Sequence, residues 1–285
     1  METRDLRPTL ADTMNDVRHV EANGLRFAYV EEGSGPLVLL LHGFPDTPHT
    51  WGDVRPRLAA KGYRAVSPFM RGYRPTAIPE RDADMETIAR DVLGLIEALG
   101  EKSAIVVGHD WGAAAAYGAA SLAPERVRKL FTLAIPHPAS MRRTPRTAWG
   151  VRHFFAYKMP GASGRFAKSD FAALRAIYKR WSPEWTPSDA ELAPVRECFA
   201  DPASLEAAMG YYRALPFSVP AYLRKRVAVD TVVFAGTSDT LLRREDYERA
   251  RRMFERSYTI EELPGGHFLH REHPDAFADR LMAHL

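Results

Sequence analysis

The sequence predicts an α/β fold, in which an eight-stranded, mostly parallel sheet carries helices on both faces and a helical insertion. Short apolar runs alternate with longer amphipathic stretches in the first half of the chain, which is typical of parallel strands joined by helical crossovers. The same alternation resumes near the C-terminus, after a long segment without buried-strand patterns. Polar residues follow several of the strands directly, where parallel sheets place their sites.

The first half of the chain contains six of the expected strands. Arg18–Glu21 and Leu25–Glu31 flank Asn23-Gly24, a dipeptide typical of a two-residue hairpin turn, so an antiparallel pair is expected at one edge. The next four strands are uniformly apolar or nearly so, as buried parallel strands are, at Leu37–Leu41, Tyr63–Ser67, Ala104–Val107 and Val127–Ile135. Helices are expected between them at Asp53–Lys61, Met85–Leu99 and Trp111–Leu122.

The composition changes after the sixth strand. From His137 to Arg226 the chain contains short amphipathic helix patterns broken by Pro and Gly, together with most of its Tyr and Trp residues. We expect this cap segment to fold as helices over the site, between the two parts of a core domain (residues 1–136 and 227–285). The remaining elements are expected to be a strand, a helix, a strand and a helix, at Thr231–Ala235, Leu241–Glu255, Ser257–Glu262 and Pro274–Leu285.

The composition excludes several classes of protein. Hydrophobic residues make up 46% of the 285 residues and charged residues 26%, so disorder is not expected. The single cysteine, Cys198, allows neither an intrachain disulfide nor a zinc cluster of cysteines. Residues 1–21 are charged and polar, and no apolar run approaches the ~20 residues of a membrane span. We therefore expect no signal peptide, no membrane association and a cytoplasmic location.

Nucleic acids, metals and organic cofactors are not expected as ligands. The net charge is +3, and the basic residues are scattered rather than collected in a block. The sequence has no glycine-rich phosphate loop. His267, His270 and His273 recur every three residues, but no acidic or cysteine partner completes a metal site. We expect a small molecule as the ligand, bound by a monomer or a homodimer.

Three polar residues follow successive strands in the order acid, acid, histidine. Asp110 lies in Gly108-His109-Asp110-Trp111-Gly112, a Gly-x-nucleophile-x-Gly pattern in which glycines permit a strained turn between strand and helix. Asp239 follows the strand expected at Thr231–Ala235, and His267 follows the last strand, Ser257–Glu262. Either Asp by itself could simply cap the following helix. The order of all three favours a catalytic triad of nucleophile Asp110, orienting acid Asp239 and base His267.

A fourth motif, His42-Gly43-Phe44-Pro45, follows the strand that ends at Leu41. In such an arrangement this loop provides one backbone N–H to an oxyanion hole, and the residue after the nucleophile provides the other. The expected donors are Phe44 and Trp111.

These motifs resemble those of the α/β-hydrolase superfamily, in particular its epoxide hydrolases and dehalogenases with an Asp nucleophile. The resemblance extends over nearly the whole chain and includes Trp51, Arg71-Gly72-Tyr73, Gly266-His267-Phe268, Glu272 and Pro274. One departure is that Met70 and Arg74 flank the Arg-Gly-Tyr motif, where the family usually has Asp and Gly. That difference affects a supporting loop more than the chemistry.

An Asp nucleophile restricts the reaction. Attack by a carboxylate at sp³ carbon gives an alkyl ester, which water activated by the histidine can hydrolyse. Attack on an ester or amide would instead give an unstable anhydride. Such a nucleophile fits an epoxide or an alkyl halide. The resemblance implies as the expected function an epoxide hydrolase that converts an apolar epoxide into a vicinal diol through an ester on Asp110, without metal or cofactor.

The resemblance also implies two cap residues that donate hydrogen bonds to the epoxide oxygen. Tyr212, in Gly210-Tyr211-Tyr212-Arg213, matches one of them. The other position, seven residues before Pro160-Gly161, is His153, as in one subgroup of epoxide hydrolases. Tyr157 is the alternative second donor.

The main alternative is a dehalogenase with the same nucleophile. Haloalkane dehalogenases often bind halide through an Asn at the position of Phe44, and haloacid enzymes hold the substrate carboxylate through Arg at the positions of Trp111 and Ala114. This Asn and these Arg residues are absent, which disfavours both reactions. Two other residues do match dehalogenases: Trp111, which epoxide hydrolases share, and His153, which haloacid enzymes also have. A non-catalytic receptor on the same fold is a different class, but such proteins commonly lack a member of the triad.

Overall fold

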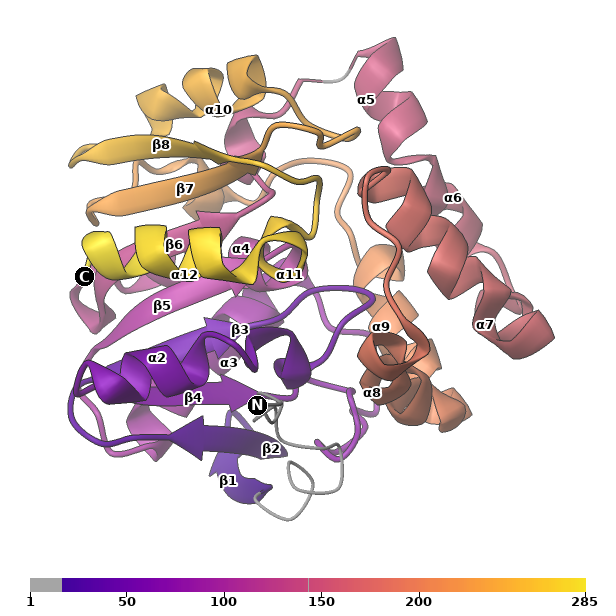
Figure 1. Cartoon of the computed structure of the whole chain (residues 1–285), viewed down its shortest axis with the longest axis horizontal. Coiled ribbons are helices and arrows are strands. Elements are labelled where there is room, and N and C mark those ends of the chain that lie inside the picture. Colours follow the sequence, from indigo (N-terminus) through magenta and orange to yellow (C-terminus); the bar gives the residue numbers. More distant parts are fainter. Residues whose placement is uncertain (1–16, 143) are drawn as a thin grey trace, which may run out of the picture.

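The computed structural model describes residues 17–142 and 144–285 (Figure 1). The charged stretch at residues 1–16, in which no signal peptide was expected, lies outside the described residues. Eight strands form one sheet in the order β1-β2-β4-β3-β5-β6-β7-β8. Their bounds are β1 Arg18–Ala22, β2 Leu25–Glu32, β3 Leu37–Leu41, β4 Arg64–Pro68, β5 Ala104–His109, β6 Val127–Leu133, β7 Thr231–Gly236 and β8 Tyr258–Leu263. The eight-stranded sheet confirms the predicted fold class.

The edge of the sheet has the predicted antiparallel hairpin. Ala22 pairs with Leu25 across the turn, and both Asn23 and Gly24 have positive φ angles, as a type I′ turn requires. β2 is antiparallel to β1 and to β4, whereas the pairs from β4 to β8 are parallel. Only β2 therefore runs against the direction of the other strands.

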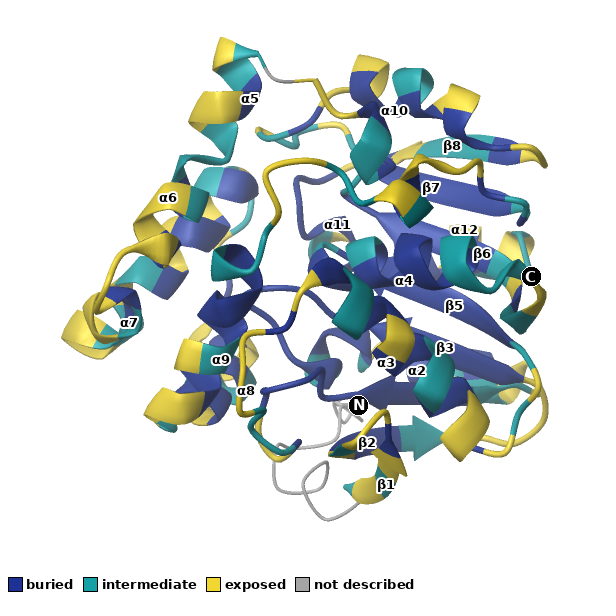
Figure 2. Ribbon diagram, turned by 180° about the vertical axis from the view of Figure 1, so that it is seen from behind, coloured by how far each residue is buried: buried dark blue, intermediate teal, exposed yellow. Residues whose placement is uncertain are grey.

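The strands bury side chains on both faces. In β3, Leu37, Leu39 and Leu41 belong to one apolar cluster, and Val38 and Leu40 to the other. This alternation has the period of two that a strand imposes, and it explains why the run is apolar at every position. Helices α2 and α12 lie in front of the sheet in Figure 1, whereas α4 lies in front in the reverse view of Figure 2.

The helices of the core enclose these two clusters. Their bounds are α2 Arg55–Ala60, α3 Met85–Ala98, α4 Trp111–Leu122, α10 Arg244–Ala250, α11 Leu269–Glu272 and α12 Pro274–Ala283, with short 3-10 helices η1 Pro48–Trp51, η2 Pro124–Arg126 and η5 Arg251–Met253. The continuous helix expected over Leu241–Glu255 is wrong at both ends, because α10 begins at Arg244 and η5 tightens the chain after Ala250.

The cap segment, residues 137–226, contains helices and no named strand among its described residues. Its elements are η3 Pro138–Ser140, α5 Pro145–Gly150, α6 Arg152–Lys158, α7 Ala162–Trp181, α8 Asp189–Ala200, α9 Pro202–Arg213 and η4 Ala221–Arg224. α5 to α9 stand together beside the sheet, on the right in Figure 1. α7 is interrupted at Lys168–Phe171 by non-helical backbone. No helix in the described part of the chain is long and apolar enough to span a membrane.

Candidate active site

Asp110 lies on a sharp turn between β5 and α4. Its φ of +51° lies in a region that non-glycine residues rarely adopt, and its side chain does not cap α4. The turn is possible because residues 108 and 112 are glycines, so backbone segments can approach each other where a side chain would otherwise stand. A Cβ on Gly108 would lie 2.3 Å from the Gly112 carbonyl oxygen, and one on Gly112 would lie 2.4 Å from the Leu41 carbonyl oxygen. The geometry excludes a simple helix-capping role for Asp110.

The Asp110 carboxylate is held from two sides. The Phe44 backbone N–H donates to its Oδ1 at 2.9 Å, and Nε2 of His267 lies 3.4 Å from its Oδ2. The Phe44 loop can approach this closely because residue 43 is glycine, whose Cβ would lie 2.4 Å from the Asp110 Cβ. Within the described residues Phe44 is the one backbone donor to this carboxylate, so the Trp111 amide makes no such bond here.

His267 connects Asp110 to Asp239. Its Nδ1 lies 3.2 Å from Oδ2 of Asp239, while Oδ1 of Asp239 accepts the N–H groups of Leu241 and Leu242 at 2.7 and 3.3 Å. Asp239 thus holds its own loop and faces the imidazole at the same time. The side chains of His267 and Asp239 are 0% and 1% exposed, against 13% for Asp110. Of the three, Asp110 is the group that an incoming molecule can reach.

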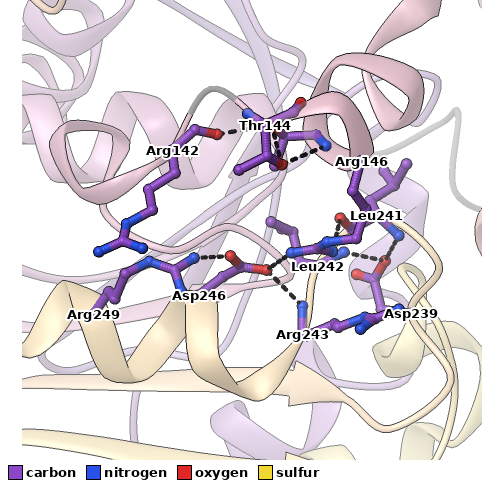
Figure 3. A network of polar contacts seen from close by, with 10 residues as sticks. Arg142, Thr144, Arg146, Asp239, Leu241, Leu242, Arg243, Asp246 and Arg249 are labelled. Atoms are coloured by element: carbon purple, nitrogen blue, oxygen red, sulfur yellow. Dashed lines mark hydrogen bonds and ion pairs between the residues drawn. The ribbon is translucent and has the colours of Figure 1, made fainter.

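A polar network ties the Asp239 loop to the cap segment (Figure 3). Arg146 of α5 donates to the Leu241 carbonyl oxygen at 3.3 Å and to Oδ2 of Asp246 at 2.7 Å. The same Asp246 oxygen accepts the Arg243 N–H at 2.9 Å, and Arg249 pairs with the other oxygen. Asp246 is buried. Its contacts with Arg146 and Arg243 fix the residues after Asp239 against α5.

The loop that carries His267 is fixed by groups outside the triad. The Trp181 carbonyl oxygen accepts the His267 backbone N–H at 3.1 Å, and His109 donates from Nε2 to the His267 carbonyl oxygen at 2.9 Å. Glu272 accepts the Gly266 N–H at 2.8 Å. Trp181 and His109 were not among the predicted site residues, although His109 lies within the motif around Asp110.

The charge states of the central pair depend on each other. Burial acts to raise the pKa of Asp110, but the hydrogen bond and charge of His267 outweigh it and hold the pKa below its ordinary value. Burial acts to lower the pKa of His267, but the hydrogen bonds and charges of Asp110 and Asp239 raise it to about 9. At neutral pH the site therefore contains a carboxylate at Asp110 and an imidazolium at His267.

The three predicted cap residues lie together above Asp110. The Tyr212 ring lies 5.1 Å from Trp111 and 5.5 Å from Phe44 between ring centroids. Tyr157 lies 5.4 Å from Phe44 and 5.0 Å from Tyr212, and His153 lies 5.7 Å from Tyr212. The negative charge of Asp110 acts on the pKa of all three, which places them around the same carboxylate.

The three side chains differ in what they can donate. Burial raises the pKa of both Tyr157 and Tyr212, so each phenol keeps its proton. The Tyr157 hydroxyl has no hydrogen-bond partner among the described residues. Nδ1 of His153 lies 3.2 Å from the Gly150 carbonyl oxygen, and since a carbonyl only accepts, this nitrogen carries the proton. Burial lowers the pKa of His153 to about 3, so its Nε2 is a bare acceptor at neutral pH.

No group of three or more His, Cys, Asp or Glu side chains in the described ranges could hold a metal ion. Within the histidine tract, His270 is buried and its Nε2 lies 2.6 Å from the Thr50 hydroxyl, whereas His273 is exposed. Cys198 is a free, buried thiol.

Comparison with known proteins agrees with this architecture. Residues 36–274 match the family described as alpha/beta hydrolase fold. An epoxide hydrolase of Caballeronia sordidicola is 31% identical over 231 residues, which cover 78% of this chain and 66% of that protein. The Bacillus subtilis AB hydrolase superfamily protein YfhM is 31% identical over 281 residues, covering 93% of this chain and 96% of its own.

Solved structures show the same similarity. Epoxide hydrolase A of Mycobacterium thermoresistibile superposes with a TM-score of 0.80 at 25% identity, over 94% of this chain and 97% of that one. The chain belongs to the α/β-hydrolase fold family. It is a hydrolase whose relatives include epoxide hydrolases.

Proposed function

We propose that this hydrolase opens an epoxide to a vicinal diol through a covalent alkyl ester on Asp110. The observation that carries the proposal is a carboxylate held between Phe44 and His267 beneath the phenols of Tyr157 and Tyr212. A carboxylate nucleophile suits attack at sp³ carbon, and the phenols suit a leaving group that remains attached as an alkoxide. The epoxide hydrolases among the relatives support this choice.

The first step forms the ester. Oδ2 of Asp110 attacks an epoxide carbon, the ring C–O bond breaks, and the ring oxygen takes a proton from a phenol. Oδ1 is already bonded to the Phe44 N–H, so it becomes the carbonyl oxygen of the ester and stays in the oxyanion site. The lowered pKa of Asp110 keeps the nucleophile ionised at neutral pH.

The second step hydrolyses the ester. Esterification removes the charge of Asp110, one of the two carboxylates that raise the pKa of His267. The pKa of the imidazole then falls, so His267 gives up its proton, which restores the phenol that protonated the ring oxygen. The neutral imidazole can then take a proton from water. The resulting hydroxide attacks the Asp110 carbonyl carbon, and charge collects on Oδ1 beside Phe44 and the first amide of α4, that of Trp111. The bond between this carbon and the alkyl oxygen then breaks, and the departing alkoxide takes the proton of the new carboxyl group. The diol is released, and Asp110 is again a carboxylate beside the His267 imidazolium.

We propose Tyr157 rather than His153 as the second acid beside Tyr212. His153 donates through Nδ1 to Gly150 and presents only a lone pair on Nε2, so the neutral ring cannot donate a hydrogen bond to the epoxide oxygen. Tyr157 retains its proton and has no partner for it in the described structure. The indole N–H of Trp111 interacts with the Tyr212 oxygen, which leaves the Tyr212 proton free to be donated.

Two assays on purified protein test the reaction class. Incubation with an aryl epoxide should give the diol, and the Asp110→Ala variant should give none. A haloalkane assayed in parallel should release no halide. Halide release without diol formation would establish the dehalogenase alternative instead.

The assignment of the acids is tested by conservative variants. Tyr157→Phe and Tyr212→Phe should each slow ester formation by about 10²-fold, as loss of one oxyanion donor does. His153→Gln should change it only a few-fold, because the proposed role of His153 is packing. A larger loss in His153→Gln than in Tyr157→Phe would reverse the assignment.

A further inference from the structure

An unpaired guanidinium stands beside the proposed acids. Arg180 is the penultimate residue of α7, and its Nε and Nη2 atoms are buried with no hydrogen-bond partner in the described structure. The groups that act on its charge are another cation, Arg152, and the phenols of Tyr157 and Tyr212. The residue as a whole is half-buried, but two guanidinium N–H groups that are buried without an acceptor are costly. These two N–H groups are therefore available to an acceptor that the described residues do not provide, and an anionic acceptor suits the charge of the group.

Arg180 belongs to the active site by position. Its Cζ lies 5.5 Å from the centroid of the Trp181 ring, and that ring lies 5.1 Å from His267 and 4.8 Å from His153. The carbonyl oxygen of Arg180 accepts the Thr240 hydroxyl at 2.7 Å, which fixes the end of α7 against the loop of the triad acid. The charge of the guanidinium also acts on the pKa of His153, Tyr157 and Tyr212, which places it close to the proposed acids.

In other arginines of this chain, the same two nitrogens, Nε and Nη2, bind a carboxylate. Arg71 donates from Nε and Nη2 to the two oxygens of Asp91 at 2.8 and 2.6 Å. Arg213 binds Asp82 through the same two nitrogens at 2.8 Å each. The N–H groups of Nε and Nη2 lie on one edge of the planar guanidinium. They are parallel and match the spacing of the two oxygens of a carboxylate. In Arg180 the same two nitrogens have no partner in the part of the chain that the structure describes.

We infer that the substrate is an epoxide that carries a carboxylate, and that Arg180 binds this carboxylate through Nε and Nη2. The inference rests on the proposed function and refines the expectation of a purely apolar epoxide. The apolar part of the substrate lies against the rings above Asp110, and its anionic group lies at the end of α7.

Hydrolysis of a matched substrate pair tests this. An epoxy acid and its primary amide differ in charge but hardly in shape, and kcat/KM should favour the acid by about tenfold or more. Arg180→Gln should remove that preference. Arg180→Lys, which keeps the charge without the two-pronged edge, should restore only part of it. A preference that is unchanged in Arg180→Gln would overturn the inference.

A matched control separates a specific contact from general attraction. Arg152→Gln removes the neighbouring cation, whose Nη1 donates to the Trp149 carbonyl oxygen, and should leave the acid-to-amide ratio within about twofold. Equal losses in Arg152→Gln and Arg180→Gln would show that net charge alone is responsible, and the carboxylate site would be rejected.

Binding without chemistry distinguishes failure of this inference from failure of the proposed function. The saturated acid of the same skeleton, which has no epoxide, should bind the native protein about tenfold more tightly than Arg180→Gln in calorimetry. If neither epoxide is hydrolysed but this difference is found, the proposed function fails and the carboxylate site stands. If both epoxides are hydrolysed equally and the saturated acid binds both proteins alike, the function stands and the site fails.

Discussion

Replacing Asp110 by Asn should lower the pKa of His267 substantially. The imidazole lies between Asp110 and Asp239, at 3.4 and 3.2 Å, and is completely buried. Its rise from the ordinary value of 6.5 to about 9 corresponds to about 3 kcal/mol in favour of the imidazolium. Burial alone favours the neutral ring, so removal of one of two carboxylates eliminates more than half of the net rise. The pKa in Asp110→Asn should then fall below about 8.

NMR titration of the His267 ring in protein labelled at histidine measures this directly, with His267→Gln identifying the signal. Glu97→Gln, which removes an exposed carboxylate of α3, is the control and should leave the titration unchanged. Because the folded-state pKa is raised, the contribution of His267 to stability is present below pH 6.5 and is lost as pH rises through about 9. In Asp110→Asn the contribution of His267 to stability should be lost at a lower pH than in the native protein. Identical titrations in the two proteins would refute the charge coupling on which the ester-hydrolysis step depends.

Three further outcomes are expected. His267→Gln should form the ester but not hydrolyse it, so mass spectrometry should find the adduct on Asp110; an adduct on another residue would contradict the assignment. Asp246→Asn, which loses the ion pair to α5, should lower the free energy of unfolding by about 1–2 kcal/mol in urea titrations, since its partner is partly exposed. Gly108→Ala should destabilise the protein by about 1–3 kcal/mol and abolish activity, because its Cβ would meet the backbone of α4 at 2.3 Å. Gly164→Ala, with open space around it, should be neutral or slightly stabilising by the same measurement.

The sheet could be predicted from the sequence because its signals are local. The apolar run Leu37–Leu41 and the turn Asn23-Gly24 each specify a conformation within a few residues. The helix predicted after β7 begins too early in the sequence, at Leu241. In the structure the carboxylate of Asp239 accepts the N–H groups of Leu241 and Leu242. Those residues thereby form a turn before α10 begins, and an apolar pattern does not show which N–H groups a side chain will take.

The position of His153 in the site could be predicted, but its chemistry could not. Whether this ring donates or accepts depends on the contact of Nδ1 with the carbonyl oxygen of Gly150, which lies three residues earlier where α5 ends. Arg180 gave no sequence signal because it stands among many arginines. Its distinction is that two of its guanidinium nitrogens are buried without a hydrogen-bond partner among the described residues, which is a property of the packed structure.

The charges of the site explain why an unpaired cation belongs there. The triad contains two carboxylates and one imidazolium, so its net charge is negative by one unit. A substrate carboxylate about 8 Å away would be repelled by about 2 kcal/mol at an effective dielectric constant of 20, while a guanidinium in contact attracts it by about 4 kcal/mol. A neutral epoxide would gain little from Arg180, and the protein would still bear the cost of burying two unpaired N–H groups. An anionic substrate satisfies those groups and overcomes the repulsion from the triad, so the inferred carboxylate and the proposed nucleophile are compatible only because Arg180 is present.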